Sequence, residues 1–464
     1  MILNKKDMKE TIDKEVSFDK YFNRSLISLV IPIALQNLIS AAVNSADIVM
    51  LSTISQSAMS AISIAGQISF VAMLFYMGLA VGAGILTAQY WGKKDFALIR
   101  RVLTISCMFS IIISFLFFMV SISFPSALVR IFTKDTELIR YGAKYQRVIS
   151  FTYLAMGLSQ MYLAIVKSME KARFCATVSS SSLLLNIVLN AMSIYILYPN
   201  EPEKAIIGVG FATVIARFIE FSCCVLYSLR KGNIRFSIPK HDGVQKTLIK
   251  DYLHYAIPVT ANYIVYGGAL AAMVVIIGHV NSDLVAANAI TNVVRNLAII
   301  LCGGIGAGGS VLVGKYLGSG DLVSAKKAGK KIYLYAFIFG VFAGIIILLI
   351  RPLVFSLVNI NTIAQCYLEI MLFVSAVWCI GKSVNSTIIG AVFPAGGDAK
   401  FGFLCDVIVM WGIIIPLGFL CAFVWRVPPV VLYIVLCCDE FIKGPVALIR
   451  FFQYRWLKNI TRNF

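Results

Sequence analysis

The sequence contains few charged residues. Only 14% of its 464 residues are Asp, Glu, Lys or Arg, whereas soluble domains carry about 25%. Hydrophobic residues make up 59%, and the mean hydropathy is +0.85. One buried core cannot hold so much apolar surface, and a membrane span needs roughly 20 mostly apolar residues. The composition excludes an ordinary soluble domain and predicts an integral membrane protein that crosses the bilayer many times.

Histidine is also scarce, and the cysteines do not form metal-binding patterns. The only histidines are His241, His254 and His279, and the 11 cysteines include no CxxC pair and mostly lie in apolar runs. Zinc-type spacing is therefore absent. A membrane-embedded enzyme, such as an acyltransferase, would need a convergent cluster of catalytic residues, which the sequence does not offer. We expect no metal site, no cofactor and no enzymatic activity.

The apolar residues form about twelve long stretches. Only helices or closed barrels satisfy every backbone polar group in lipid, and continuous apolar runs are typical of helices rather than of barrel strands. We therefore predict an all-α protein with twelve transmembrane helices. The predicted spans are residues 26–51, 62–88, 102–125, 148–167, 175–198, 205–229, 255–279, 286–314, 331–357, 367–390, 401–425 and 428–450.

The net charge of +19 is explained by topology rather than by nucleic-acid binding. Basic residues gather in the first 25 residues, in every second loop and after residue 450, with Lys167 counted in one of these loops. The basic loop from Arg130 to Arg147 is the one poor fit. Because Lys and Arg are biased toward the cytoplasm, we expect both termini there. The polar leader lacks the apolar core of a signal peptide, so we interpret residues 1–25 as a cytoplasmic tail.

The chain contains an internal repeat. "IPIALQNLIS" at 31–40 resembles "IPVTANYIVY" at 257–266, and "AQYWGKKD" at 88–95 resembles "GKYLGSGD" at 314–321. The pairs Pro32/Pro258, Gly92/Gly318 and Asp95/Asp321 share one offset. We predict two six-helix lobes, residues 26–229 and 255–450, joined by a basic linker at 230–254 and followed by a tail at 451–464. An even number of helices per copy predicts a pseudo-two-fold axis along the membrane normal.

Asp47 is the main candidate for function. An aspartate at the centre of a membrane helix costs roughly 2.5–3.5 kcal/mol, and such residues usually face a bundle interior or a watery cavity. Asn186 and Asn190 are four residues apart, hence on one helical face, and Thr213 lies in the following span. Their oxygens suit a small cation or a proton relay. The alternative is that the asparagines are hydrogen-bonding contacts between helices.

Other charges in the spans are interpreted as structural. Arg217 and Glu220 are three residues apart, Asp439, Glu440 and Lys443 form a similar group, and Arg295 and Asp406 are isolated within their spans. Lys382 either pairs with an acid or lines a cavity.

Several motifs together resemble the multidrug and toxic compound extrusion (MATE) transporters. They are "IPIALQNLISAAVNSADIVML", "TAQYWGKKD", "NIVLN", "VGKYLGSGD" and "GAVFPAGGDAKF" with "MWGIIIPLGFL". The resemblance implies two lobes around a central cavity, and export of organic cations driven by inward flow of H⁺ or Na⁺. It also implies that Asp47 is the coupling residue and that Asn186, Asn190 and Thr213 complete its site. The seventh span has no acid and the tenth carries Lys382, so we do not expect a sodium site in the carboxy-terminal lobe.

We expect the substrate cavity to use polar and aromatic residues of the opening helices of the two halves, together with Lys382. The candidates are Gln36, Asn44, Asn262, Tyr263 and Tyr266. Aromatic faces attract organic cations, and Pro32 and Pro258 can let these helices bend.

The sequence predicts a monomeric secondary exporter of small molecules, chiefly organic cations, in the bacterial cytoplasmic membrane. The coupling ion, H⁺ or Na⁺, stays open, although a single carboxylate favours H⁺. The alternative is a lipid-linked oligosaccharide flippase, which Lys382 and Arg295 would support.

Overall fold

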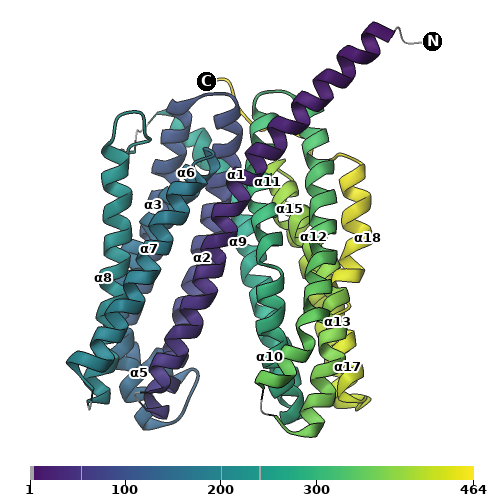
Figure 1. Ribbon diagram of the computed structural model, residues 1–464. Helices are drawn as coiled ribbons and strands as arrows, with labels where there is room; N and C mark the ends of the chain where they lie inside the picture. The colour runs from purple at the N-terminus through teal and green to yellow at the C-terminus, as the bar shows by residue number, and fades with distance from the viewer. Residues whose placement is uncertain (1–4, 54, 200, 240–241, 359) are drawn as a thin grey trace.

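The computed structural model describes residues 5–464 except 54, 200, 240, 241 and 359, and it leaves out the side chains of residues 5–16 and of Ile48. The described residues form helices and connecting turns, with no strand (Figure 1). This confirms the prediction of an all-α fold. The predicted tail 1–25 and linker 230–254 lie partly outside the described residues.

The described residues of the first half of the chain form eight α-helices. They are α1 (Lys5–Ser52), α2 (Gln56–Gly92), α3 (Phe96–Ser123), α4 (Pro125–Arg130), α5 (Thr136–Ile149), α6 (Thr152–Ser168), α7 (Ala172–Ala191) and α8 (Pro202–Leu229). A π-helical turn, Met192–Leu197, extends α7.

The second half begins with the long helix α9 (Gly243–Gly278) and ends with the short helices α17 (Pro429–Leu436) and α18 (Asp439–Phe452). Between them lie α10 (Ser282–Ala298), α11 (Ile300–Gly318), α12 (Leu322–Leu357), α13 (Thr362–Thr387), α14 (Phe393–Ala395), α15 (Ala399–Asp406) and α16 (Ile415–Phe419). A π-helical turn at Ile388–Val392 joins α13 to α14, and another at Val407–Ile414 joins α15 to α16. A third, at Leu420–Val424, follows α16.

The helices account for the predicted spans, with three differences. Ten described helices are long and apolar enough to cross a membrane, and an eleventh span results if α5 and α6, bent by 50°, form one. Residues of helix α5 therefore occupy the predicted basic loop Arg130–Arg147, and Asp135 caps the first turn of this helix. The predicted span 286–314 is two helices, broken at Ile299. The last span, 428–450, is broken between α17 and α18 and carries four charged residues, Asp439, Glu440, Lys443 and Arg450.

The repeated motifs occupy equivalent positions in the two halves. Gly92 ends α2 and Gly318 ends α11. Asp95 then caps α3 by accepting a hydrogen bond from the backbone of Leu98, and Asp321 caps α12 in the same way. An N-cap carboxylate satisfies a backbone N–H that the helix leaves unpaired. The Gly…Asp motif is therefore a helix–turn–helix connection that occurs once in each half.

The same glycines bring the two halves into backbone contact. A Cβ added at Gly92 would lie 2.0 Å from the carbonyl oxygen of Lys315, and one at Gly318 would lie 1.8 Å from that of Gln89. Residues 92 and 89 are the repeat partners of 318 and 315, so each contact is the symmetric copy of the other. Helices approach this closely only where one partner lacks a side chain. These contacts show the pseudo-two-fold relation directly.

Further along, a second pair of helix crossings follows the same symmetry. Gly82 of α2 packs against Ala256 of α9, and its repeat partner Gly308 of α11 packs against Leu29 and Val30 of α1. Helices α2 and α11 thus lie at the centre, with α9 and α1 crossing them. The two halves meet along these four helices.

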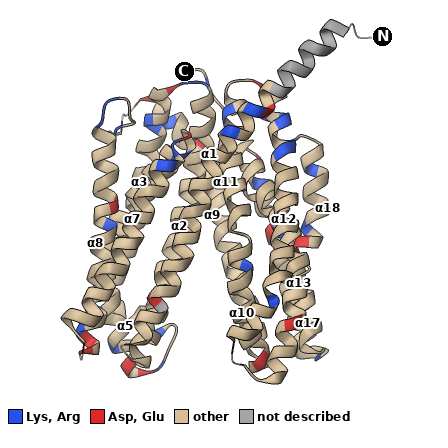
Figure 2. Cartoon of the chain, in the orientation of Figure 1, with Lys and Arg blue, Asp and Glu red and all other residues tan. Residues whose placement is uncertain are grey.

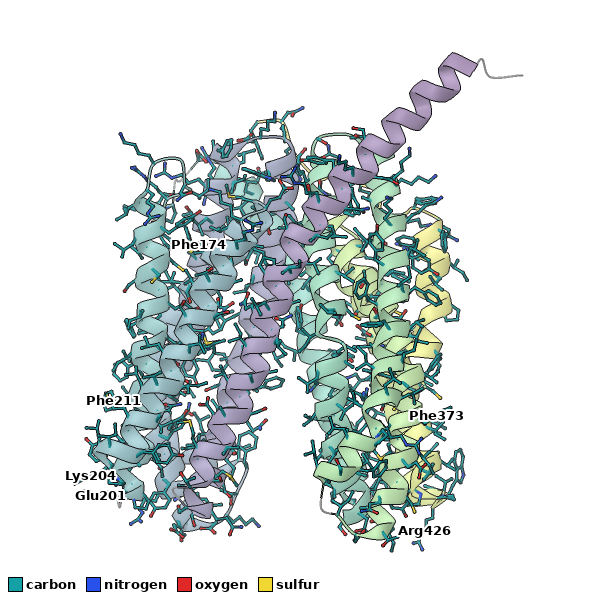
Figure 3. The ribbon with its side chains drawn as sticks, in the orientation of Figure 1. Phe174, Glu201, Lys204, Phe211, Phe373 and Arg426 are labelled. Carbon is teal, nitrogen blue, oxygen red and sulfur yellow. The ribbon has the colours of Figure 1, made fainter. Side chains whose placement is uncertain are left out.

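The two halves meet at the end that carries both termini, which we call the terminal end, and diverge toward the opposite, distal end (Figure 1). Lys and Arg are prominent at the terminal end (Figure 2). Glu201, Lys204 and Arg426 mark the distal end, whereas Phe211 and Phe373 lie on opposite outer flanks (Figure 3). These two rings are 54% and 57% exposed, as expected for side chains that face lipid.

The backbone contact at Gly92 predicts a sharp cost for a single methyl group. We expect Gly92→Ala to destabilise the protein by roughly 1–3 kcal/mol, because the methyl group would force α2 and α11 apart. Gly66→Ala, in the same helix, has no atom within 4 Å of the added Cβ and should leave stability unchanged or slightly raised. Thermal unfolding in detergent measures both. Equal unfolding temperatures for the two variants would contradict the tight contact.

Candidate functional site

Asp47 lies on α1 and forms the start of a chain of side-chain hydrogen bonds. Asn190 of α7 donates from Nδ2 to Oδ1 of Asp47 at 3.0 Å and lies 3.4 Å from Oδ1 of Asn186. Asn186 in turn donates to Thr213 Oγ1 of α8 at 3.2 Å. The structure therefore brings together the four residues that the sequence groups. We call them the Asp47 cluster.

The Asp47 cluster has a free acceptor at its centre. Oδ1 of Asn190 is buried and receives no hydrogen bond, although the residue is only 4% exposed. Leaving such a group unpaired costs free energy, about 1–3 kcal/mol. Asp47 also has no ion-pair partner among the described residues. A carboxylate beside an unpaired amide oxygen suits a proton or a small cation as its ligand.

The cluster holds a single carboxylate, which limits what it can bind. Among the described residues, no group of three or more His, Cys, Asp or Glu side chains is placed to hold a metal ion. A tight transition-metal site would need such a group. The cluster therefore offers a ligand one carboxylate, two amide oxygens and one hydroxyl.

A separate cavity of about 610 Å³ lies between the two halves. Five of the six predicted cavity residues line it, namely Gln36, Asn262, Tyr263, Tyr266 and Lys382. Asn44 does not: it is exposed on α1, two turns beyond the last cavity-lining residue of that helix, Asn37. None of the Asp47 cluster lines this cavity either. The candidate ion site and the candidate substrate site are thus distinct places connected by α1.

The carboxy-terminal half contributes a buried network of charges to the cavity wall. The ammonium group of Lys443 lies 3.1 Å from Asp439, 3.2 Å from Asp406 and 3.5 Å from Glu440. Lys382 ion-pairs with Glu440 at 3.2 Å. Asp406 has no partner within its own span, and the structure supplies one from another helix. We call these five residues the charge network.

Neighbouring side chains complete the charge network. Lys382 donates to the hydroxyl of Tyr266, and Asn385 donates to Glu440 at 2.9 Å. Arg295 stacks over Trp378, whose indole N–H donates to Asp439. Lys382 therefore both pairs with an acid and lines the cavity, which joins the two roles that the sequence left open.

Sequence reasoning assigned Asp406, Glu440 and Lys443 a structural role only, although they line the cavity, and it placed a fourth charged residue of the cavity in a loop. Lys167, counted among the cytoplasmic loop residues, lines the cavity from α6. Gln160 and Ser168 line it from the same helix. Gln160 and Lys167 are seven residues apart, and this spacing of two polar residues on one face of an apolar helix was the available signal.

The cavity is closed at the terminal end by the buried side chain of Gln89. Its amide group donates to the carbonyl oxygens of Ala395 at 2.8 Å and Lys458 at 3.2 Å, and its Oε1 accepts from the N–H of Ile460. One side chain of α2 thus ties three backbone groups of the other half.

One ion pair reinforces this closure: Lys315 of α11 lies 2.7 Å from Glu170 of the first half. Arg462, near the end of the chain, forms two hydrogen bonds with Asp251 of α9 and so anchors the last residues within the second half. The hydrogen bonds with Asp251 raise the pKa of the Arg462 guanidinium above its ordinary value. Pro32 and Pro258 lie within α1 and α9, the two helices that cross the contact between the halves.

Comparisons with known proteins agree with this architecture. The MatE family model matches residues 32–192 and 246–420. The "Uncharacterized transporter YisQ" of Bacillus subtilis is 21% identical over 97% of this chain and 99% of its own length. The "Multidrug resistance protein NorM" of Photobacterium profundum is 23% identical over 88% of this chain and 89% of its own.

A solved structure shares the fold. It is described as an "outward-facing conformation of a multidrug resistance MATE family transporter of the MOP superfamily". It matches with a TM-score of 0.83 at 15% identity and covers 94% of this chain and 97% of its own. Because the family model covers well over half of the sequence, the chain belongs to the MatE family of multidrug and toxic compound extrusion transporters.

Proposed function

We propose that the protein exports organic cations, drugs among them, in exchange for H⁺ or Na⁺. The observation that carries this proposal is the Asp47 cluster: one carboxylate next to an unpaired, buried acceptor, Asn190 Oδ1. The central cavity receives the substrate, and the two halves alternate around it. Because one chain supplies both places, a monomer suffices. The site of action is the bacterial cytoplasmic membrane, with both termini in the cytoplasm.

The conformation supports the direction of coupling. With the termini in the cytoplasm, the Gln89 closure seals the cytoplasmic side and the halves diverge toward the outside. Asp47 lies close to the distal end of α1, five residues before Ser52, and so takes up the ion from outside. Ion binding then drives transport only because the two conformations differ in affinity for it.

The cavity offers suitable partners for an organic cation. Oδ1 of Asn262 and Oδ1 of Asn385 are buried acceptors without a hydrogen bond, and both residues line the cavity. Tyr263 and Tyr266 add aromatic rings, which attract cations by about 0.5–2 kcal/mol. The substrate's N–H groups and positive charge thus find acceptors in the carboxy-terminal half.

We assign the charge network a structural role, because each of its acids and amines has an oppositely charged partner within the network. Removing one partner of a buried ion pair leaves an uncompensated charge, at a cost of about 3–5 kcal/mol. Asp439, Glu440 and Lys443 are at most 3% exposed. The network therefore holds α13, α15 and α18 together rather than serving as a second ion site.

The structural role predicts a stability defect. Lys443→Met should lower the yield of folded protein and its unfolding temperature strongly, because three carboxylates would lose their shared partner. Adding Asp439→Asn should recover part of the loss. Lys204→Met removes an exposed lysine of the ion pair with Glu201 and should leave the yield and the unfolding temperature nearly unchanged. Size-exclusion chromatography and thermal unfolding measure all three. A Lys443→Met protein as stable as Lys204→Met would refute the assignment.

The coupling role predicts a transport defect without a folding defect. Asp47→Asn keeps the shape of the side chain but removes its charge, so ethidium efflux driven by an imposed H⁺ or Na⁺ gradient should fall to background. Glu201→Gln, an exposed carboxylate at the distal end, should retain efflux. Each gradient is imposed separately in proteoliposomes, which identifies the coupling ion. Normal gradient-driven efflux by Asp47→Asn would overturn the assignment of this residue.

A further inference from the structure

Lys167 lies on the cavity face of α6. Five residues of this helix line the cavity, namely Gln160, Leu163, Ala164, Lys167 and Ser168. Their spacing of three or four residues describes one continuous helical stripe. The lysine is therefore part of the cavity wall and not of a cytoplasmic loop, although it lies only one residue before the end of α6.

The charge of Lys167 is not neutralised by the protein. The ammonium groups of Lys382 and Lys443, the other lysines of the cavity wall, form ion pairs with carboxylates. The ammonium group of Lys167 has neither a hydrogen bond nor an ion pair with any other described residue. The two acids that line the cavity, Asp406 and Glu440, are already paired within the charge network. Among the charged side chains that line the cavity, the ammonium group of Lys167 is therefore the one for which the described residues supply no partner.

An unpaired ammonium group in a partly enclosed wall loses hydration and gains nothing in return. A carboxylate or phosphate group of a bound molecule would restore the missing interaction with a charge-assisted hydrogen bond. We propose that Lys167 binds an acidic group of the transported molecule. The substrate class is then an amphoteric organic compound, whose cationic part meets Asn262 and Asn385 while its acidic part meets Lys167. This inference rests on the proposed function, since it concerns the same cavity.

Two dyes that differ by one ester test the proposal. Rhodamine 110 carries a free carboxylate, and rhodamine 123 is its methyl ester and a cation. In proteoliposomes with an imposed ion gradient, we expect Lys167→Gln to raise the KM for rhodamine 110 about tenfold or more, while the KM for rhodamine 123 changes less than twofold. Lys167→Arg keeps the charge and should restore most of the affinity. Lys231→Gln, which removes an exposed lysine after α8, should change neither KM.

An acidic lipid headgroup presents the same chemistry, and a second arm separates it from a soluble acid. Flipping of fluorescent phosphatidylglycerol is compared with that of fluorescent phosphatidylcholine in the same vesicles. Faster flipping of the acidic lipid by the wild type, lost in Lys167→Gln, would place the acidic group on a lipid. No flipping, with the rhodamine 110 effect present, would place it on a soluble substrate.

The remaining outcomes overturn the proposal. Equal changes in both KM values would show that Lys167 has a general structural role, for example one in which its ammonium group extends to the cytoplasm. An unchanged KM for rhodamine 110 in Lys167→Gln, or wild-type transport of rhodamine 123 alone, would show that Lys167 does not bind an acidic group of the substrate. The exporter proposal would remain intact. Wild-type protein that moves neither dye nor lipid under either gradient would refute the exporter proposal as well.

Discussion

At the crossing of α2 and α11, glycines leave no side chain between the two helices, so their backbones are in direct contact. The rest of the structure depends on this contact. Gly92 and Gly318 each meet the backbone of the opposite half, and the two contacts are symmetric copies. Because backbone cannot be compressed, the halves can separate or rotate here but cannot approach further. The central cavity therefore ends at this contact, and Gln89 closes it with hydrogen bonds to backbone groups of the other half.

Helix α1 connects the places that function requires. Leu29 and Val30 pack against Gly308 of the opposite half, Gln36 lines the cavity, and Asp47 lies in the candidate ion site. All of them lie on one helix, so a change at the Asp47 cluster can reach the contact between the halves through a rigid element. Pro32 lies between these places and removes one backbone hydrogen bond from the helix. Coupling needs such an element with two arrangements, each favoured by a different ligand.

The sequence predicted what depends on local spacing or on repetition. The offset between Gly92 and Gly318 anticipated two equivalent helix–turn–helix connections, and the spacing of Asn186 and Asn190 put both on the face that meets Asp47. It could not predict the charge network, because Lys443 and Asp406 are brought together from different helices by packing alone. Lys167 was misplaced for a related reason: counting charges by segment assigns a lysine near a helix end to the loop, whereas only the helix register places it on the cavity wall.

The two halves share a fold but treat their charges differently. In the carboxy-terminal half, two lysines and three carboxylates pair with one another within a few ångströms, so binding of a further ion there would have to break existing pairs. In the amino-terminal half, Asp47 and Lys167 have no ion-pair partners among the described residues, and they lie in separate places. An unpaired charge binds a counter-ion without first losing a partner. The amino-terminal half therefore holds charges that are free to pair with a ligand, whereas the charges of the network in the carboxy-terminal half already pair with one another.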